Sequence, residues 1–146
     1  MATRSSIILT DGATRIVLYR HYDGYPSVNG LDLANIMAET VKFSEKYESK
    51  MTSDGASIRT IDDNFREPIQ FFLEKLLSHD GDYKIQSFVS DDSEYIYDIG
   101  FLRTEFTFRI GSSDFKDNYF LFVGKFAKVK ELIKKLNKDI KNGELE

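Results

Sequence analysis

Residues able to contact a ligand are concentrated in the segment 20–30 (RHYDGYPSVNG). It supplies charged or titratable groups and aromatic rings within six positions: Arg20, His21, Tyr22, Asp23 and Tyr25. Gly30 directly precedes a predicted helix, and the free N–H groups of a helix N-terminus favour an anion. The same residues also suit a tight turn in which the tyrosines pack and the aspartate bonds its own backbone. Both interpretations stay open at this point.

A second concentration lies on the predicted strand 104–110 (TEFTFRI). Alternation places its phenylalanines on one face and Glu105, Thr107 and Arg109 on the other, where Arg103 joins them if it belongs to the strand. The preceding strand, 94–101, places Tyr95, Tyr97 and Phe101 together on one face. Arginine beside aromatic rings is typical of a nucleotide pocket, because guanidinium binds phosphate and a ring stacks on a base. The alternative is a solvated sheet face with cross-strand ion pairs.

Metal and nucleophilic chemistry have little support in the sequence. There are two histidines, His21 and His79, and no cysteine, so thiolate zinc sites and cysteine nucleophiles are excluded. The run HDGD at 79–82 is more typical of a helix end than of a metal corner, because a histidine suits the negative end of the helix dipole. His21 lies beside Asp23 and near Ser27, but spacing does not show that a catalytic set converges. We therefore expect no catalytic residues, no metal and no cofactor.

Composition limits the classes of function. The chain has 146 residues, 41% of them hydrophobic, which is typical of one globular domain spanning 1–146. Its net charge of −4 argues against general nucleic-acid binding, which needs a basic footprint. No apolar run reaches the length of a membrane span, and the N-terminus lacks the apolar stretch of a secretion signal. We expect a cytoplasmic protein that does not bind membranes.

The elements expected to position these residues follow from hydrophobic periodicity. A hairpin and loop should occupy 1–30, two helices 31–78, antiparallel strands 83–123 and a C-terminal helix 125–142. In detail, we expect strands at 5–10, 15–20, 83–89, 94–101, 104–110 and 119–123, helices at 31–45, 62–78 and 125–141, and a flexible connection at 46–60. Asp62 or Asp63 could cap the second helix. The fold class is α+β, with a mostly antiparallel sheet, two central helices and a C-terminal helix.

The C-terminal helix has an apolar stripe at helical spacing, surrounded by lysines. The stripe consists of Phe126, Val129, Ile133, Leu136 and Ile140. A helix with such a stripe must cover either its own sheet or that of a partner. We expect the protein to form a homo-oligomer, a dimer or larger.

The N-terminal quarter resembles a group of small phage and prophage proteins. The resemblance rests on Thr3-Arg4-Ser5, an apolar strand, an Asp-Gly turn and the octapeptide Tyr-Arg-His-Tyr-Asp-Gly-Tyr-Pro at 19–26, where Tyr22 replaces a usual tryptophan. Among phage proteins of this size, the chain is similar in length and α+β character to the first Thoeris anti-defence family. That resemblance implies a dimeric or larger sponge, which binds a cyclic ADP-ribose signal without cleaving it.

The resemblance also implies a type of pocket, in which arginine binds pyrophosphate and an aromatic ring stacks on adenine. Arg20, Arg103 and Arg109 fit the first role, and Phe88, Tyr95, Tyr97 or Phe101 fits the second. The expected function is therefore sequestration of a cyclic ADP-ribose isomer inside an infected host cell. Two other classes stay open. One is a phage inhibitor that binds a host protein, such as an anti-CRISPR or a host-takeover factor. The other is a small phosphodiesterase that depends on His21.

Overall fold

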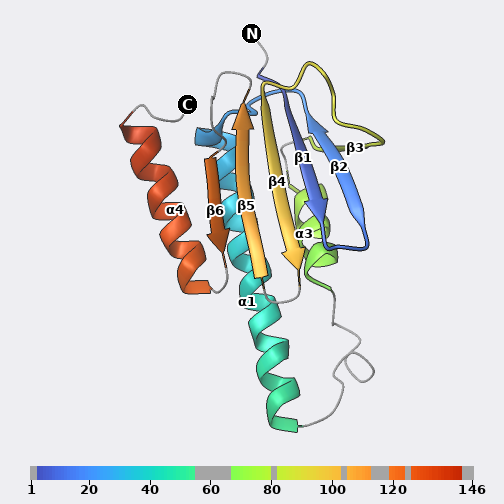
Figure 1. Ribbon diagram of the computed structural model, residues 1–146, viewed down its shortest axis with the longest axis vertical. Coiled ribbons are helices and arrows are strands. Elements are labelled where there is room, and N and C mark those ends of the chain that lie inside the picture. The colour runs from blue at the N-terminus through green and yellow to red at the C-terminus, as the bar shows by residue number, and fades with distance from the viewer. Residues whose placement is uncertain are drawn as a thin grey trace.

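A six-stranded sheet forms one layer of the molecule, and helices cover one of its faces (Figure 1). The computed structural model describes residues 3–54, 67–79, 82–102, 105–112, 119–123 and 126–142. The strand order is β3-β2-β1-β4-β5-β6. The strands are β1 (Ser5–Thr10), β2 (Arg15–Arg20), β3 (Lys84–Gln86), β4 (Tyr95–Leu102), β5 (Glu105–Ser112) and β6 (Tyr119–Val123). The helices are α1 (Leu31–Asp54), α3 (Pro68–Leu77) and α4 (Phe126–Lys141), and a π-helical turn, η1 (Pro26–Gly30), leads into α1.

The expected fold class is confirmed. The sheet is antiparallel at every pairing except β1 with β4, which run parallel. Short connections make β4, β5 and β6 antiparallel neighbours, as expected. The parallel pair arises because β2, two helices and β3 lie between β1 and β4 in the chain, which gives room for a crossover.

Three expected boundaries were wrong. The helix expected at 62–78 begins at Pro68, after Glu67 in an extended conformation. The helix expected at 31–45 extends to Asp54, so residues 46–54 are helical rather than a connection. The strand expected at 83–89 pairs only over Lys84–Gln86, opposite Val17–Tyr19 of β2. The proposed cap residues Asp62 and Asp63 lie outside the described residues.

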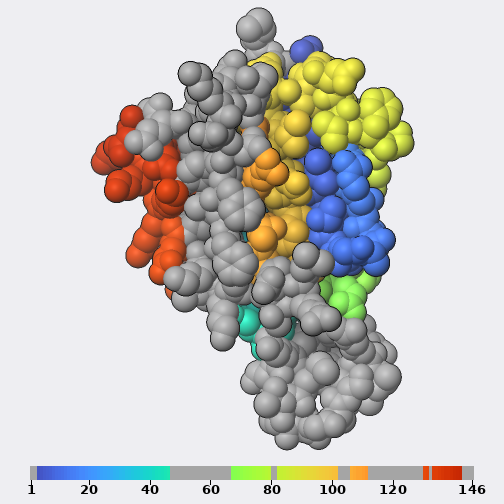
Figure 2. Space-filling model, viewed as in Figure 1, coloured from blue at the N-terminus to red at the C-terminus, as the bar shows by residue number. Residues whose placement is uncertain are grey.

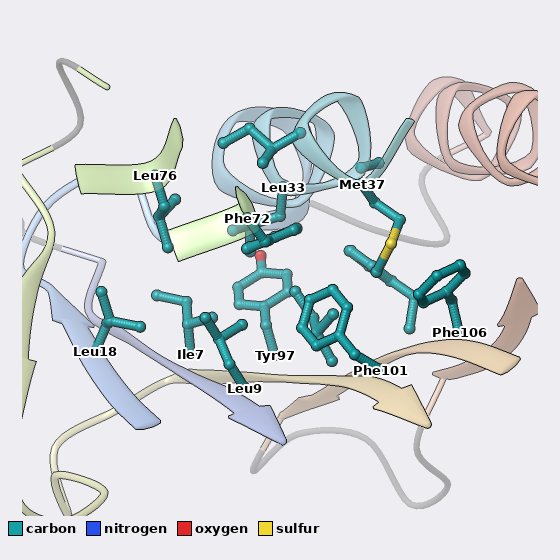
Figure 3. Packing of buried hydrophobic residues seen from close by; sticks show 14 of the residues in the cluster. Ile7, Leu9, Leu18, Leu33, Met37, Phe72, Leu76, Tyr97, Phe101 and Phe106 are labelled. Atoms are coloured by element: carbon teal, nitrogen blue, oxygen red, sulfur yellow. The ribbon is translucent and has the colours of Figure 1, made fainter. Parts of the chain in front are cut away.

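The core lies between the sheet and α1 and α3 (Figure 3). The inner face of the sheet carries Ile7, Leu18 and Tyr97, which are completely buried against Leu33 of α1 and Phe72 of α3. The apolar face that alternation creates on each strand packs here against the apolar face that the 3.6-residue spacing creates on each helix. Figure 2 shows the opposite face, where side chains of β1, β2, β4 and β5 are visible and α1 and α3 are largely hidden behind the sheet.

Helix α4 packs within its own chain. It contacts α1, β6 and η1. Leu136 of the predicted apolar stripe is fully buried, and Ile133 and Ile140 pack against the core cluster. The described part of the stripe, Ile133 to Ile140, thus packs within the chain, and homo-oligomer formation stays a prediction. In the part of the chain that the structure describes, none of the helices has the length and apolar character needed to cross a bilayer.

Candidate functional site

The loop after β2 is held against the N-terminal segment and β4. The backbone N–H of Gly24 donates to the carbonyl of Thr3 at 2.9 Å, and the hydroxyl of Tyr97 donates to the carbonyl of Gly24 at 2.7 Å. A Cβ at Gly24 would lie 2.8 Å from both the Thr3 oxygen and Ser5 Cβ. Asp23 adopts a positive φ of 56°, a conformation that aspartate tolerates better than most residues. The Asp-Gly pair therefore has a structural reason: the chain turns sharply where no side chain fits.

The next residues convert the loop into a helix. The carbonyl of Tyr25 accepts hydrogen bonds from the N–H groups of Val28 and Asn29, and Pro26 occupies the first turn, where its missing N–H is not needed. The hydroxyl of Tyr25 donates to Asp23 at 3.2 Å, and this hydrogen bond is the main cause that raises the pKa of Tyr25. The segment 20–30 is thus an ordered connection with its polar groups largely paired.

Arg20 lies beneath this loop on the inner face of the sheet. It is 93% buried, since 7% of its surface is exposed. Its Nη1 donates to the Tyr83 hydroxyl at 2.8 Å, to Asn29 Oδ1 at 3.3 Å and to Asp32 Oδ2 at 3.4 Å. The guanidinium carbon also lies 5.1 Å from the centre of the Tyr83 ring, within cation–π distance. A buried charge persists only where such partners compensate its lost hydration.

The partners of Arg20 also bind one another. Tyr83 donates to Asn29 Oδ1, and Asn29 Nδ2 donates to Ser5 Oγ at 2.9 Å. Burial raises the pKa of Tyr83 to about 12, against the opposing effect of Arg20. Tyr83 is therefore a neutral donor at physiological pH. This cluster, which we call the Arg20 network, ties the end of β2 to η1, to the start of α1 and to the residue before β3.

The Arg20 network reaches solvent at Asp32 and His79. The side chains of these residues are 30% and 35% exposed, and His79 Nε2 lies 3.7 Å from Asp32 Oδ2. His79 follows the last turn of α3, where its N–H donates to the Leu76 carbonyl at 3.1 Å. The histidine thus occupies the helix-end position that its sequence context favours, and it faces the carboxylate that also contacts Arg20.

His21 points to the other face of the sheet and joins a second polar chain. The Tyr19 hydroxyl lies 3.1 Å from His21 Nδ1 and 3.5 Å from Asp92 Oδ2. Arg4 Nε lies 3.3 Å from the same carboxylate oxygen. Burial, followed by the charge of Asp92, raises the pKa of Tyr19, so its hydroxyl keeps its hydrogen at neutral pH. We call Arg4, Tyr19, His21 and Asp92 the His21 chain.

Tyr22 is the exposed aromatic side chain of the octapeptide. It is 63% exposed, and its ring stands edge-on to His21 with the centroids 4.5 Å apart. Its neighbours in the octapeptide have structural roles: Arg20 in the buried network, Gly24 in the tight turn and Pro26 at the helix start. Packing does not explain an exposed ring at position 22, which marks it as a candidate for recognition.

The other predicted site residues do not gather at this loop. Arg109 is exposed on the outer face of β5, opposite Asp98 of β4, whereas Arg20 lies on the inner face, so the two arginines do not share a pocket. Tyr97 is completely buried in the core and uses its hydroxyl on Gly24, so its ring is not open to a ligand (Figure 3). Phe88 is 66% exposed in the connection between β3 and β4. Arg103 lies outside the described residues.

Sequence reasoning missed the residues that organise this end of the sheet. These are Tyr19, Asn29, Asp32, Tyr83 and Asp92. One signal was present: alternation along β2 places Arg20 on the same face as Ile16 and Leu18, and a charge on an apolar face requires acceptors. Those acceptors come from two separate segments, 29–32 and the residue before β3, and a single sequence does not show which segments meet.

The chemistry of this end of the sheet consists of hydrogen bonding and ring contacts. Among the described residues, no group of three or more histidine, aspartate or glutamate side chains is placed to hold a metal ion. Comparison with protein-family models, with curated proteins and with solved structures gave no match. The functional argument therefore rests on the loop itself: an ordered connection that presents His21 and Tyr22 to solvent.

Proposed function

We propose that this protein binds a small nucleotide signal of the cyclic ADP-ribose class at the 20–30 loop and sequesters it without cleaving it. The single observation that carries the proposal is the exposed ring of Tyr22, mounted beside His21 on a loop fixed by backbone and side-chain hydrogen bonds. A ring held in place loses little conformational entropy on binding, and aromatic–base stacking contributes roughly 1–3 kcal/mol per base.

Polar groups from neighbouring segments lie beside the loop and suit the rest of such a ligand. Arg4 and Asp92 are partly exposed beside His21, at 37% and 52% of their side-chain surfaces. Arg4 provides a guanidinium for a pyrophosphate, and imidazole or carboxylate groups suit ribose hydroxyls. The Arg20 network supports the loop from below, so we assign Arg20 a positioning role in this proposal rather than direct contact with phosphate.

The test is recovery of the ligand. The protein is incubated with cyclic ADP-ribose isomers and, separately, with cyclic oligonucleotides, washed free of unbound ligand and denatured by heat, and the released compound is identified by mass spectrometry. Release of an intact cyclic ADP-ribose isomer supports sequestration. Release of an altered compound indicates a phosphodiesterase and overturns the non-catalytic role.

Variants locate the site. Tyr22→Ala should reduce uptake at least tenfold, which corresponds to about 1.4 kcal/mol. Phe88→Ala is the matched control, because Phe88 is, among the described residues, a second ring of comparable exposure, at 66%. If Phe88→Ala abolishes uptake and Tyr22→Ala does not, the ligand stacks in the connection between β3 and β4 instead.

A second candidate function has its own observation. Leu77, Ile85 and Phe88 are exposed at 47%, 59% and 66%, and Ile85 belongs to β3, the outermost strand on its side of the sheet. Exposed apolar side chains at a strand edge favour binding of a host protein. Absence of any nucleotide uptake, together with loss of host-protein binding in Ile85→Lys, would favour this inhibitor over the sponge.

A further inference from the structure

The His21 chain has a direction, because its members differ in what they can donate. A carboxylate only accepts hydrogen bonds, so the contact between the Tyr19 hydroxyl and Asp92 Oδ2, at 3.5 Å, places the hydroxyl hydrogen on the Asp92 side. The hydroxyl oxygen then faces His21 Nδ1 at 3.1 Å with its lone pairs. With its single hydrogen donated to Asp92, the hydroxyl can only accept from His21 Nδ1, which then carries a hydrogen.

We propose that Tyr19 and Asp92 hold neutral His21 with its hydrogen on Nδ1, so that Nε2 is a hydrogen-bond acceptor for a donor group of the ligand. Tyr19 is then a positioning residue that acts through His21. Within the part of the chain that the structure describes, no hydrogen bond to Nε2 is formed, and the half-buried imidazole lies at a right angle to the Tyr22 ring. In a neutral imidazole the hydrogen bond at one nitrogen determines the role of the other.

An acceptor at His21 Nε2 determines which kind of base the loop binds, an inference that rests on the proposed function. The ring centroids of Tyr22 and His21 lie 4.5 Å apart, so a base in contact with Tyr22 is within reach of the imidazole. An acceptor at Nε2 pairs with the amino group of adenine and faces an oxygen, another acceptor, at the same position of hypoxanthine. The site should therefore prefer the amino-bearing base, since an unpaired polar group in a contact lowers affinity.

The state of His21 can be measured without any ligand. Long-range ¹H–¹⁵N correlation spectra distinguish the two nitrogens of each imidazole, and the chain has only two histidines to assign. We expect His21 to carry its hydrogen on Nδ1 in the wild type and to become a mixture of tautomers in Tyr19→Phe and Asp92→Asn. Tyr25→Phe is the matched control, because it removes a hydroxyl of the same loop that bonds Asp23 and not His21. A wild-type His21 protonated on Nε2, or a tautomer that is the same in all variants, overturns the proposal.

The ligand arm uses a cyclic ADP-ribose closed between its two riboses, which leaves the adenine amino group free, and its hypoxanthine counterpart. The adenine form should bind the wild type at least tenfold more tightly, and Tyr19→Phe should reduce that ratio. Equal binding of both forms by a wild type with hydrogen on Nδ1 refutes the base preference. If neither form binds, the proposed function and the base preference both fail, whereas the spectra still decide whether Tyr19 positions His21.

Discussion

Replacing Arg20 by alanine should destabilise the fold, because the guanidinium is the centre of a buried network. The variant removes the charged hydrogen bond to the Tyr83 hydroxyl at 2.8 Å, for which about 1.5–3 kcal/mol is typical. It also removes two longer contacts, to Asn29 and Asp32, and a cation–π contact at 5.1 Å that adds about 1 kcal/mol. Relief of the desolvation of a buried cation offsets part of this loss. The net loss should be about 2–4 kcal/mol, a decrease of roughly 6–12 °C in Tm for a domain of this size.

The assay is urea denaturation followed by circular dichroism, with Arg15→Ala as the matched control. Arg15 belongs to the same strand and is exposed at its other end, so its removal should change the free energy of unfolding by less than about 0.5 kcal/mol. A loss below about 1 kcal/mol in Arg20→Ala would refute the network as a stabilising element. If uptake of a cyclic ADP-ribose isomer then fell at least tenfold in that stable variant, Arg20 would serve the ligand site, by contact or by positioning the loop, rather than the stability of the fold.

Four further changes test other parts of the structure. Gly24→Ala should lower the free energy of unfolding by about 1–3 kcal/mol in denaturant titrations, because its Cβ would lie 2.8 Å from a backbone oxygen that shifts little. Tyr97→Phe should lose about 1–2 kcal/mol by removing the donor to the Gly24 carbonyl, and hydrogen exchange should show the opening in the 20–30 loop. Tyr83 should not affect the free energy of unfolding below pH 10, but should lower it between about pH 10 and 12, because the phenol loses its proton near pH 10 in the unfolded chain and near 12 in the folded chain. Tyr83→Phe should remove up to about 2–3 kcal/mol of that decrease, measured as the free energy of unfolding against pH. Tyr22→Ala should change Tm by no more than 1–2 °C, since its ring is 63% exposed, and a larger decrease would mean that the ring packs rather than recognises.

The sequence predicts the fold where a periodic pattern coincides with burial. The alternation in β5 placed Phe108 on a core face, where it is completely buried, whereas Tyr97, expected as a ring for a ligand, is buried on the same face. Hydrophobic periodicity did not predict the helix at residues 46–54, because α1 extends past the end of the sheet there, as Figure 1 shows. A helix beyond the layer that it covers needs no continuous apolar stripe, so a helix of polar residues does not show the pattern that was sought.

The sequence pointed to the segment of the candidate site, 20–30, but not to the residues from other segments that contact it. The segment 20–30 is an ordered loop in which Asp23 and Gly24 make the expected turn, while Tyr22 is exposed instead of packed. The interpretation of the loop as a ligand site stays a prediction. The pairing of Arg109 with the aromatic residues of β4 could have been doubted from alternation alone, because Tyr97 shares the face of Phe108 and not of Arg109. Asp92 reaches the loop through the β3–β4 connection, and such long-range contacts have no local signal.

The parallel pairing of β1 with β4 has a consequence for how the chain is made. Ser5 is paired with Tyr95, so the central contact of the sheet joins segments that leave the ribosome far apart in time. At roughly 5–20 residues per second, the first hairpin waits about 4–16 s for β4, and during that interval one edge of β1 has no strand beside it. Closing so long a segment has an entropic cost of about 4 kcal/mol before the pairing compensates it. Folding should therefore be slow for a domain of this size, with β4 rather than the hairpin limiting the rate, and the nascent hairpin should be a substrate for chaperones that bind apolar strands.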